Sequence, residues 1–390
     1  MSNKHRSPSI LRYSKICGTK NTTAKITSQH GLIYGKLLRT FGDIPARMYW
    51  EINEQAIADY RKLAQGIDCD FREQDNFIYS LDSREELETE LEALNSLEIP
   101  GELVDDLPLP METAGAVRFT GQAMFHPLKF IGGIAEGLRI FEKTRAREFQ
   151  GNRVITDRGY IQAKKIIIAT HFPIINKHGG YFVKQYQNRS YVLALKGAET
   201  LNGMFLGTGK EDYSFRTWGD FLLLGGGGHR TGKKGRGWEP LEEFADLHYP
   251  GARQVYRWAA QDCMSLDSMP YIGRYGKNTP DLFVATGFNK WGMTGSMVAA
   301  TVLTDLILER ENPYCSLFSP GRSSMHPQLF CNGVESMVNL LRPTTPRCPH
   351  LGCALRWNPF EHSWDCPCHG SRFAEDGTLI DNPATDDKQM

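Results

Sequence analysis

Four of the nine cysteines in this 390-residue chain lie close together near its C-terminal end, in the segments CPHLGC and CPCHGS. Each segment also carries a histidine, His350 two residues after Cys348 and His369 three residues after Cys366. Thiolate sulfur and imidazole nitrogen are side-chain donors that soft and borderline metals prefer. The pattern therefore predicts a metal site with two sulfur and two nitrogen ligands.

Two kinds of site use this set of four ligands. In a [2Fe-2S] cluster of mixed ligation, one iron takes both cysteines and the other takes both histidines, so each segment must supply one of each. A tetrahedral zinc ion could use the same four atoms. A second pair, Cys353 and Cys368, stands at matching places in the two segments. A tetrahedral zinc ion takes four ligands, so a zinc site does not account for all six cysteine and histidine side chains. The sequence favours the cluster, with zinc and a purely structural cysteine group as alternatives.

The two segments resemble the two boxes of Rieske [2Fe-2S] proteins at all six diagnostic cysteine and histidine positions. The resemblance implies a disulfide between Cys353 and Cys368. It also implies a [2Fe-2S] cluster with four ligands, which are Cys348, His350, Cys366 and His369.

The larger part of the chain contains elements that could position a second site. KKIIIATH at 164–171 and DLFVATG at 281–287 are short apolar runs bounded by turns, typical of parallel strands buried on both faces. A helix is predicted from about 292 to 310. Its N-terminus, the strand before it and the glycine loop that joins them make a corner suited to an anion or ligand. Further helices are predicted at 43–66 and 83–95.

Five segments in this larger part resemble, in order, the landmarks of the D-amino-acid-oxidase/glycine-oxidase class of FAD-dependent oxidoreductases. More narrowly, they resemble its bacterial subgroup with a C-terminal Rieske domain. The segments, within a match over roughly 14–312, are NTTAKITSQHGLIY (21–34), MFHPLKF (124–130), KKIIIATHFP (164–173), SMPYIGR (268–274) and ATGFNKWGMTGSMVAA (285–300).

The resemblance implies FAD as a second cofactor. It makes Arg274 a candidate for binding a substrate carboxylate, and it assigns no residue an acid or base role. The residues expected to contact FAD are Asn21, Thr22, Thr23, Ala24, Ala146, Ala169, Thr170, Gly287, Lys290, Trp291, Gly292, Met293 and Thr294.

The class normally begins with a strand, a GxGxxG turn, a helix and a second strand, and we expect this first βαβ unit to be absent from the chain. The glycine run GGGGHRTG at 225–232 has the wrong spacing to replace it, so we expect a loop after the strand DFLLL. Either the start of the chain is truncated or mis-assigned, which we favour, or the domain has lost its flavin.

The expected fold is therefore an α/β flavoprotein of the two-dinucleotide type with an α+β substrate subdomain, lacking its first βαβ unit, plus a small all-β Rieske domain. The predicted boundaries are 1–312 for the FAD-dependent oxidoreductase domain, 313–340 for a linker with one short helix at 334–341, and 341–390 for an abbreviated Rieske domain.

Composition limits the partners. Lysine plus arginine (45) balances aspartate plus glutamate (45), so nothing favours nucleic acid. There is no secretory signal or apolar run long enough for a membrane span, and a cytoplasmic location is expected.

The expected function is an oxidoreductase that passes electrons from a small amine-like substrate through FAD to the cluster and on to an acceptor protein. The alternatives are a non-enzymatic Rieske electron carrier or redox sensor with a degenerate flavin domain, and a zinc-stabilised interaction module.

Overall fold

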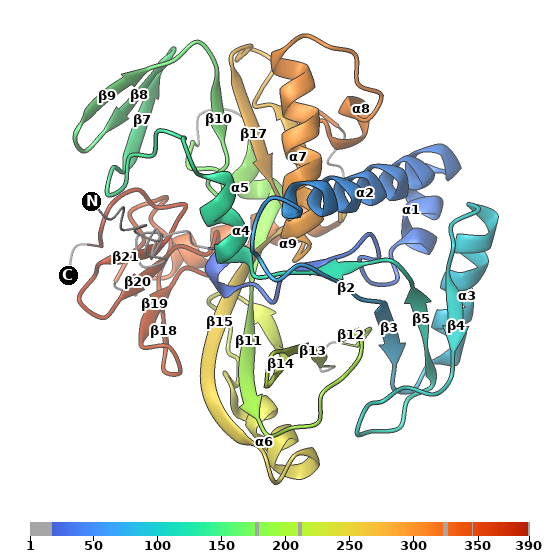
Figure 1. Cartoon of the computed structure of the whole chain (residues 1–390). Coiled ribbons are helices and arrows are strands. Elements are labelled where there is room, and N and C mark those ends of the chain that lie inside the picture. Colours follow the sequence, from blue (N-terminus) through green and yellow to red (C-terminus); the bar gives the residue numbers. More distant parts are fainter. Residues whose placement is uncertain (1–17, 176–178, 210–212, 323–326, 345, 389–390) are drawn as a thin grey trace, which may run out of the picture.

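The computed structural model describes residues 18–175, 179–209, 213–322, 327–344 and 346–388. An eight-stranded sheet forms the lower half of the molecule in Figure 1, and α6 (Glu239–His248) packs on one of its faces. All neighbouring strands are antiparallel except β12 and β3. In spatial order the strands are β15 (Arg253–Ser265), β11 (Gln185–Lys196), β14 (Phe221–Arg230), β13 (Ser214–Trp218), β12 (Met204–Gly207), β3 (Asn76–Ser80), β5 (Gly115–Phe119) and β4 (Glu102–Val104).

The glycine run at 225–232 is not a loop, because β14 continues through its first glycines as far as Arg230. Gly225 pairs with Val192 on one side and with Ser214 on the other. A Cβ at Gly225 would lie 2.7 Å from Ser214 Oγ, so this position in the sheet has no room for a side chain. Glycine inside a strand often marks such a close approach, and the loop prediction was wrong for that reason.

A second sheet has three strands in the order β10 (Ile166–Ile168), β17 (Leu282–Thr286) and β16 (Tyr271–Arg274). The predicted parallel pairing of β10 with β17 is present, with Ile168 opposite Val284. The prediction that this strand is buried on both faces was wrong for β10, because Ile167 is 47% exposed. Among the described residues, β10 pairs with β17 alone.

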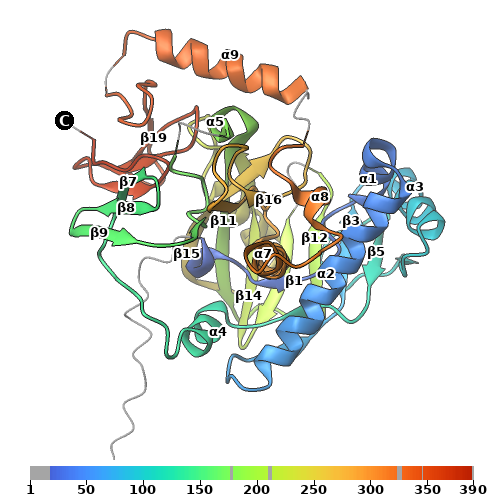
Figure 2. The same cartoon turned by 90° about the horizontal axis from the view of Figure 1, so that it is seen from above.

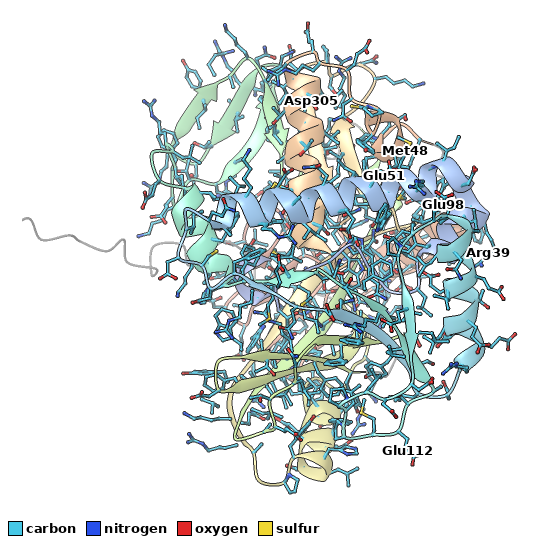
Figure 3. All side chains as sticks on the ribbon, turned by 45° about the vertical axis from the view of Figure 1, so that its right-hand side comes forward. Arg39, Met48, Glu51, Glu98, Glu112 and Asp305 are labelled. Atoms are coloured by element: carbon cyan, nitrogen blue, oxygen red, sulfur yellow. A yellow bond between two sulfur atoms is a disulfide. The ribbon has the colours of Figure 1, made fainter. Side chains whose placement is uncertain are left out.

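Helices cover this second sheet and the end of the first. The predicted helix at about 292–310 is α7 (Gly292–Ile307), and the predicted helix at 43–66 is α2 (Asp43–Ala64). The two helices cross, as Figure 3 shows by Asp305 on α7 and Glu51 on α2. The predicted helix at 83–95 is α3 (Arg84–Ser96), which Ser83 caps by accepting a hydrogen bond from the Glu86 amide. The shorter helices are η2 (Thr19–Asn21), α1 (Tyr34–Phe41), α4 (Pro127–Ile134), α5 (Tyr181–Lys184) and α8 (Cys315–Phe318).

Two small antiparallel sheets complete this part. One has the order β1 (Lys25–Ile26), β6 (Ala123–Met124) and β2 (Arg72–Glu73), and the other has the order β7 (Ala146–Gln150), β8 (Arg153–Thr156) and β9 (Gly159–Gln162). None of the helices in the described part of the chain has the length and apolar character of a membrane span.

The C-terminal part is a four-stranded antiparallel sheet, in agreement with the predicted all-β domain. Its strands, in spatial order, are β18 (Arg356–Asn358), β19 (Ser363–Asp365), β20 (Arg372–Ala374) and β21 (Leu379–Asp381). Figure 1 shows it beside β15 and below the β7–β9 sheet.

The helix preceding this sheet is longer than predicted. The short helix expected at 334–341 is the second half of α9 (Pro327–Leu341), a 15-residue helix along the outer side of the molecule (Figure 2). Its polar side faces the protein, since Asn332 and Asn339 are buried while Phe330 and Leu341 are more than 70% exposed.

Candidate functional site

The segments CPHLGC and CPCHGS fold as two similar loops. In each loop, the amide of the first cysteine, Cys348 or Cys366, donates to the carbonyl five residues further on, at 2.9 and 2.8 Å. The carbonyl of the same cysteine accepts from the amide of Gly352 or Gly370, at 2.9 Å in both loops. Both glycines have positive φ, +78° and +82°, a conformation that glycine adopts without strain. The loops therefore present Cys348 and Cys366 from equivalent backbone positions, with His350 two residues after its cysteine and His369 three residues after its own.

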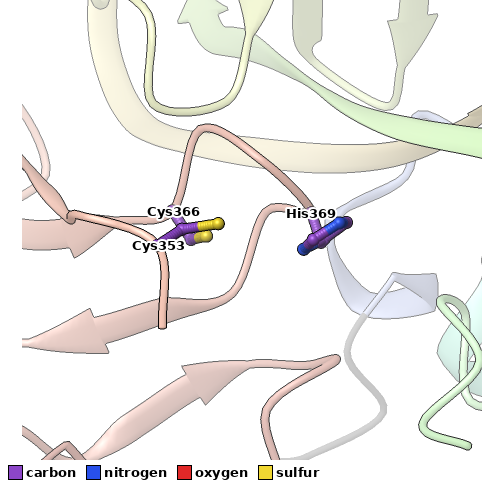
Figure 4. Close-up of side chains that lie close together, drawn as sticks. All are labelled: Cys353, Cys366 and His369. Atoms are coloured by element: carbon purple, nitrogen blue, oxygen red, sulfur yellow. The ribbon is translucent and has the colours of Figure 1, made fainter. Parts of the chain in front are cut away.

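A disulfide joins the two loops between Cys353 and Cys368, the pair implied by the resemblance, across a sequence separation of 15 residues. Cys353, Cys366 and His369 lie together in Figure 4, with their potential ligand atoms within 4.8 Å of one another. The Cys353 sulfur is used in the disulfide, so it cannot also bind a metal as a thiolate. The cysteines available to a metal in these loops are Cys348 and Cys366, which are free and buried.

The four expected cluster ligands are brought together. The thiols of Cys348 and Cys366 are in hydrogen-bond contact, and this contact lowers the pKa of Cys366 well below its ordinary value and raises that of Cys348. The ring centroids of His350 and His369 are 4.9 Å apart. Burial, followed by the neighbouring His369, lowers the pKa of His350 to about 3, so its imidazole is neutral and has a lone pair available.

These residues fit a metal cluster. Both ring nitrogens of His369 are buried, and neither has a hydrogen-bond partner among the described residues. Buried polar nitrogens without a partner are costly, and bonds to iron would remove that cost. Two thiols and two imidazoles, one of each from either loop, are the donors that a mixed-ligand [2Fe-2S] cluster requires.

The second loop lies against the larger part of the chain. Gln187 on β11 donates to the His369 carbonyl at 3.0 Å, and Gln261 on β15 donates to the Gly370 carbonyl at 2.9 Å. The His369 ring contacts Phe172 and Phe182, with centroid distances of 6.3 and 6.0 Å. This histidine is only 2% exposed, so one side of the candidate cluster site faces the protein interior.

Buried ion pairs strengthen the same interface. Glu361 in the C-terminal part accepts from both Nε (3.0 Å) and Nη2 of Arg189 on β11, and from Tyr191 Oη at 3.3 Å. Arg372 also donates to Glu361, at 2.8 Å, and it is paired with Asp365 at 3.0 Å as well. The four charged side chains are between 3 and 10% exposed, so the pairs are poorly screened by solvent.

A cavity of about 1100 Å³ lies between the eight-stranded sheet and the β10–β17–β16 sheet, and it reaches this interface at Asn382. Ligand pockets commonly have volumes of roughly 300–1,000 Å³, so this one has room for a flavin together with a small substrate. The expected flavin contacts that line it are Asn21, Thr22, Thr23, Ala169, Thr170, Lys290, Trp291, Gly292 and Met293.

The remaining expected contacts do not line the cavity. Ala24 and Thr294 are buried behind its wall, and Gly287 takes the positive φ (+73°) of the turn after β17. Ala146 lies on β7 of the separate small sheet. The side chain of Arg274 is exposed at the end of β16, away from the cavity where a substrate carboxylate was expected.

The N-terminus of α7 opens onto the cavity. Lys290, Trp291 and Gly292 line the cavity directly before and at the first turn of this 16-residue helix, and no side chain caps it. Free amides and the helix dipole favour negative charge at such a place. This corner is the one predicted from the strand, glycine loop and helix pattern.

Several cavity residues were missed by sequence reasoning. Four of them come from four different strands, namely Lys25 on β1, Ser190 on β11, Gly228 on β14 and Asp262 on β15. A fifth, Asn382, follows β21 in the C-terminal part. Burial raises the pKa of Asp262. Of these residues, only Gly228 left a signal in the sequence, as a member of the glycine run.

Comparisons with known proteins agree with both the larger part of the chain and the C-terminal part. The model of the FAD dependent oxidoreductase family matches residues 16–306, and the model of the Rieske [2Fe-2S] domain matches residues 338–389. The chain is 35% identical to YhfW of Bacillus subtilis, whose name describes a Rieske 2Fe-2S iron-sulfur protein, over 94% of this chain and 84% of that one.

Solved structures show the same fold. Glycine oxidase from Geobacillus kaustophilus superposes with a TM-score of 0.64 at 16% identity, covering 79% of this chain and 89% of its own. L-proline dehydrogenase from P. horikoshii gives a TM-score of 0.63 at 15% identity, covering 78% and 87%.

Proposed function

Because the chain belongs to the FAD dependent oxidoreductase family and carries a C-terminal Rieske [2Fe-2S] domain, we propose that it passes electrons from a small amine-like substrate through FAD to the cluster and on to an acceptor protein. Similar structures that are named for glycine and L-proline support an amine as the electron donor. In this scheme the functional parts are 1–312 for the flavin, 313–340 as the connection and 341–390 for the cluster.

In the proposal, Cys348 and Cys366 would hold one iron and His350 and His369 would hold the other. The cavity residues at the α7 N-terminus would hold the flavin, and the helix dipole there would favour negative charge on its reduced form. When bound, FAD supplies the two-electron oxidation of the substrate and can release those electrons one at a time. The protein's own part is to position the substrate, exclude water and hold the two centres next to one another.

The observation that carries the proposal is the shared wall between the cavity and the candidate cluster site. Thr170 lines the cavity at the end of β10, and Phe172, two residues later, contacts the His369 ring. Asn382 also lines the cavity, and its amide donates to the carbonyls of both Thr170 and Phe172. The cluster would be a fixed acceptor for electrons that leave a flavin in this cavity. A tether and a packed interface give such an acceptor a high effective concentration.

Absorption and EPR spectra of the purified chain test the proposal, together with iron, zinc and flavin content. We expect flavin absorption bands and the EPR signal of a reduced Rieske cluster in the same sample. A Rieske signal without flavin would support the electron carrier instead. A colourless protein containing zinc would contradict both.

A further inference from the structure

Two cations, Lys25 in the cavity wall and Arg216 on a strand beside it, have no carboxylate partner among the described residues. Lys25 on β1 lines the cavity, and its Nζ donates to the Phe205 carbonyl at 3.4 Å. Arg216 on β13 is 3% exposed and donates to the Phe125 carbonyl at 3.3 Å, while its Nε has no hydrogen-bond partner among the described residues. Neither cation forms an ion pair in the described part of the chain.

The strand register places both cations at the same end of the cavity. Phe205, whose carbonyl holds Lys25, lies on β12 between Met204 and Leu206, which are opposite Arg216 and Ser214 on β13. Ser214 lines the cavity, and Arg216, two residues later on the same strand, is on the same face of the sheet. The two cations are close enough for Arg216 to lower the pKa of Lys25.

The surroundings suit a small polar ligand. Ser190 on β11 lines the cavity, and its buried hydroxyl has no hydrogen-bond partner among the described residues. Gly225 and Gly226 on β14 also line it and leave the sheet surface free of side chains between β11 and β13. The groups nearest to Arg216 by register are Ser214, two residues before it on β13, and Gly225, which is opposite Ser214 on β14. A hydroxyl and open backbone near cations are features by which proteins bind a carboxylate.

Leaving the half-buried Lys25 and the buried Arg216 without a counter-charge is costly. Burial, and then the neighbouring Arg216, lower the pKa of Lys25 from 10.5 to about 7. Burial, and then the neighbouring Arg72, lower the pKa of Arg216 to about 9. A structural role would be served better by a neutral side chain, since buried charges normally have a counter-ion. An anionic ligand would supply the missing negative charge.

We propose that Lys25 and Arg216 form a subsite for an anionic oxygen group, and that its source is the carboxylate of the substrate. This deepens the proposed function: the amine-like substrate also carries a carboxylate, which is bound here and not by the exposed Arg274. The same chemistry could be supplied by a phosphate of the cofactor, so the experiment separates the two sources.

The test is calorimetric titration of the purified full-length protein, as isolated with its cofactors, using acetate, inorganic phosphate and methylammonium as probes. We expect acetate to bind and methylammonium not to bind. Because a charge-assisted hydrogen bond is lost, Lys25→Met weakens acetate binding about 10- to 100-fold, whereas Lys25→Arg retains most of it. Exposed Lys196 is 52% accessible, so Lys196→Met provides the matched control with unchanged binding.

Two further readouts keep the proposal falsifiable. Acetate binding at pH 8 should take up protons in the wild type and not in Lys25→Met, which titrations in two buffers of different ionisation enthalpy detect. Retention of bound FAD by Lys25→Met is expected, whereas loss of FAD together with tighter phosphate than acetate binding would assign the cations to the cofactor and overturn the proposal. Equal acetate binding by wild type and Lys25→Met, or no acetate binding at all, would also overturn it. Acetate binding needs no turnover, so it can succeed or fail independently of the electron-transfer proposal.

Discussion

The ion pair between the C-terminal part and β11 uses one carboxylate, that of Glu361, and Glu361→Gln removes its charge while keeping its volume. Glu361 is the only ion-pair partner of Arg189 among the described residues, whereas Arg372 keeps Asp365 and Asp381, at 3.0 and 3.1 Å. The variant therefore leaves one guanidinium, 3% exposed, without its counter-charge. Removing one partner of a buried pair costs about 3–5 kcal/mol.

Hydrogen exchange measures this cost where it acts. Amides of β11 and β20 should open more easily in Glu361→Gln, and a loss of about 3 kcal/mol corresponds to exchange about 100-fold faster, since 1.4 kcal/mol is a factor of ten. The control is Glu51→Gln, because Glu51 pairs with Arg47 at 3.2 Å with both side chains about 40% exposed. That change should cost about 0–1 kcal/mol. Exchange at β11 within fivefold of the wild type would refute the reasoning.

Three further outcomes are expected. Gly370→Ala places a Cβ 2.7 Å from a side chain of β11 at a φ of +82° and should destabilise by about 1–3 kcal/mol, whereas Gly132→Ala, with nothing within 4 Å, should not; urea unfolding compares them. Replacing Cys353 and Cys368 by alanine should cost about 3 kcal/mol for a loop of this length, measured as a lower temperature of cluster loss, and an unchanged temperature would count against the disulfide. The pKa of Lys25 is about 7 in the folded chain and 10.5 in the unfolded chain, so the unfolded chain binds more protons between these values. The free energy of unfolding of the wild type should therefore rise by about 1–2 kcal/mol between pH 7 and 9 relative to that of Lys25→Met. Parallel pH curves for the two proteins would contradict this.

The parts of the fold that follow from local patterns were predictable. The helices α2, α3 and α7 have caps or regular apolar spacing, and the β10 and β17 segments are apolar runs bounded by turns. The cluster site was predictable for a different reason: both loops carry their own donors within a few residues, so spacing alone brings each cysteine near its histidine.

The parts that depend on contacts between distant segments were not predictable. The glycines of β14 were interpreted as a loop because the group that excludes a Cβ at Gly225 is Ser214 on β13, a contact that the sequence does not show. The first half of α9 was missed because it contains Pro327 and Gly333, residues that are typical of turns and loops. Lys25 is an ordinary lysine in the sequence; only its position over β12 and beside Arg216 makes it unusual.

Internal electron transfer between the two centres is tested most directly by anaerobic flash reduction of the purified chain with a deazaflavin radical, following flavin and cluster absorbance together. Since the His369 loop is packed against the cavity wall at Phe172, the reduced flavin should reoxidise as the cluster is reduced, with one first-order rate that does not change with protein concentration. A cluster that stays oxidised while the flavin remains reduced, or a rate proportional to protein concentration, would contradict the account.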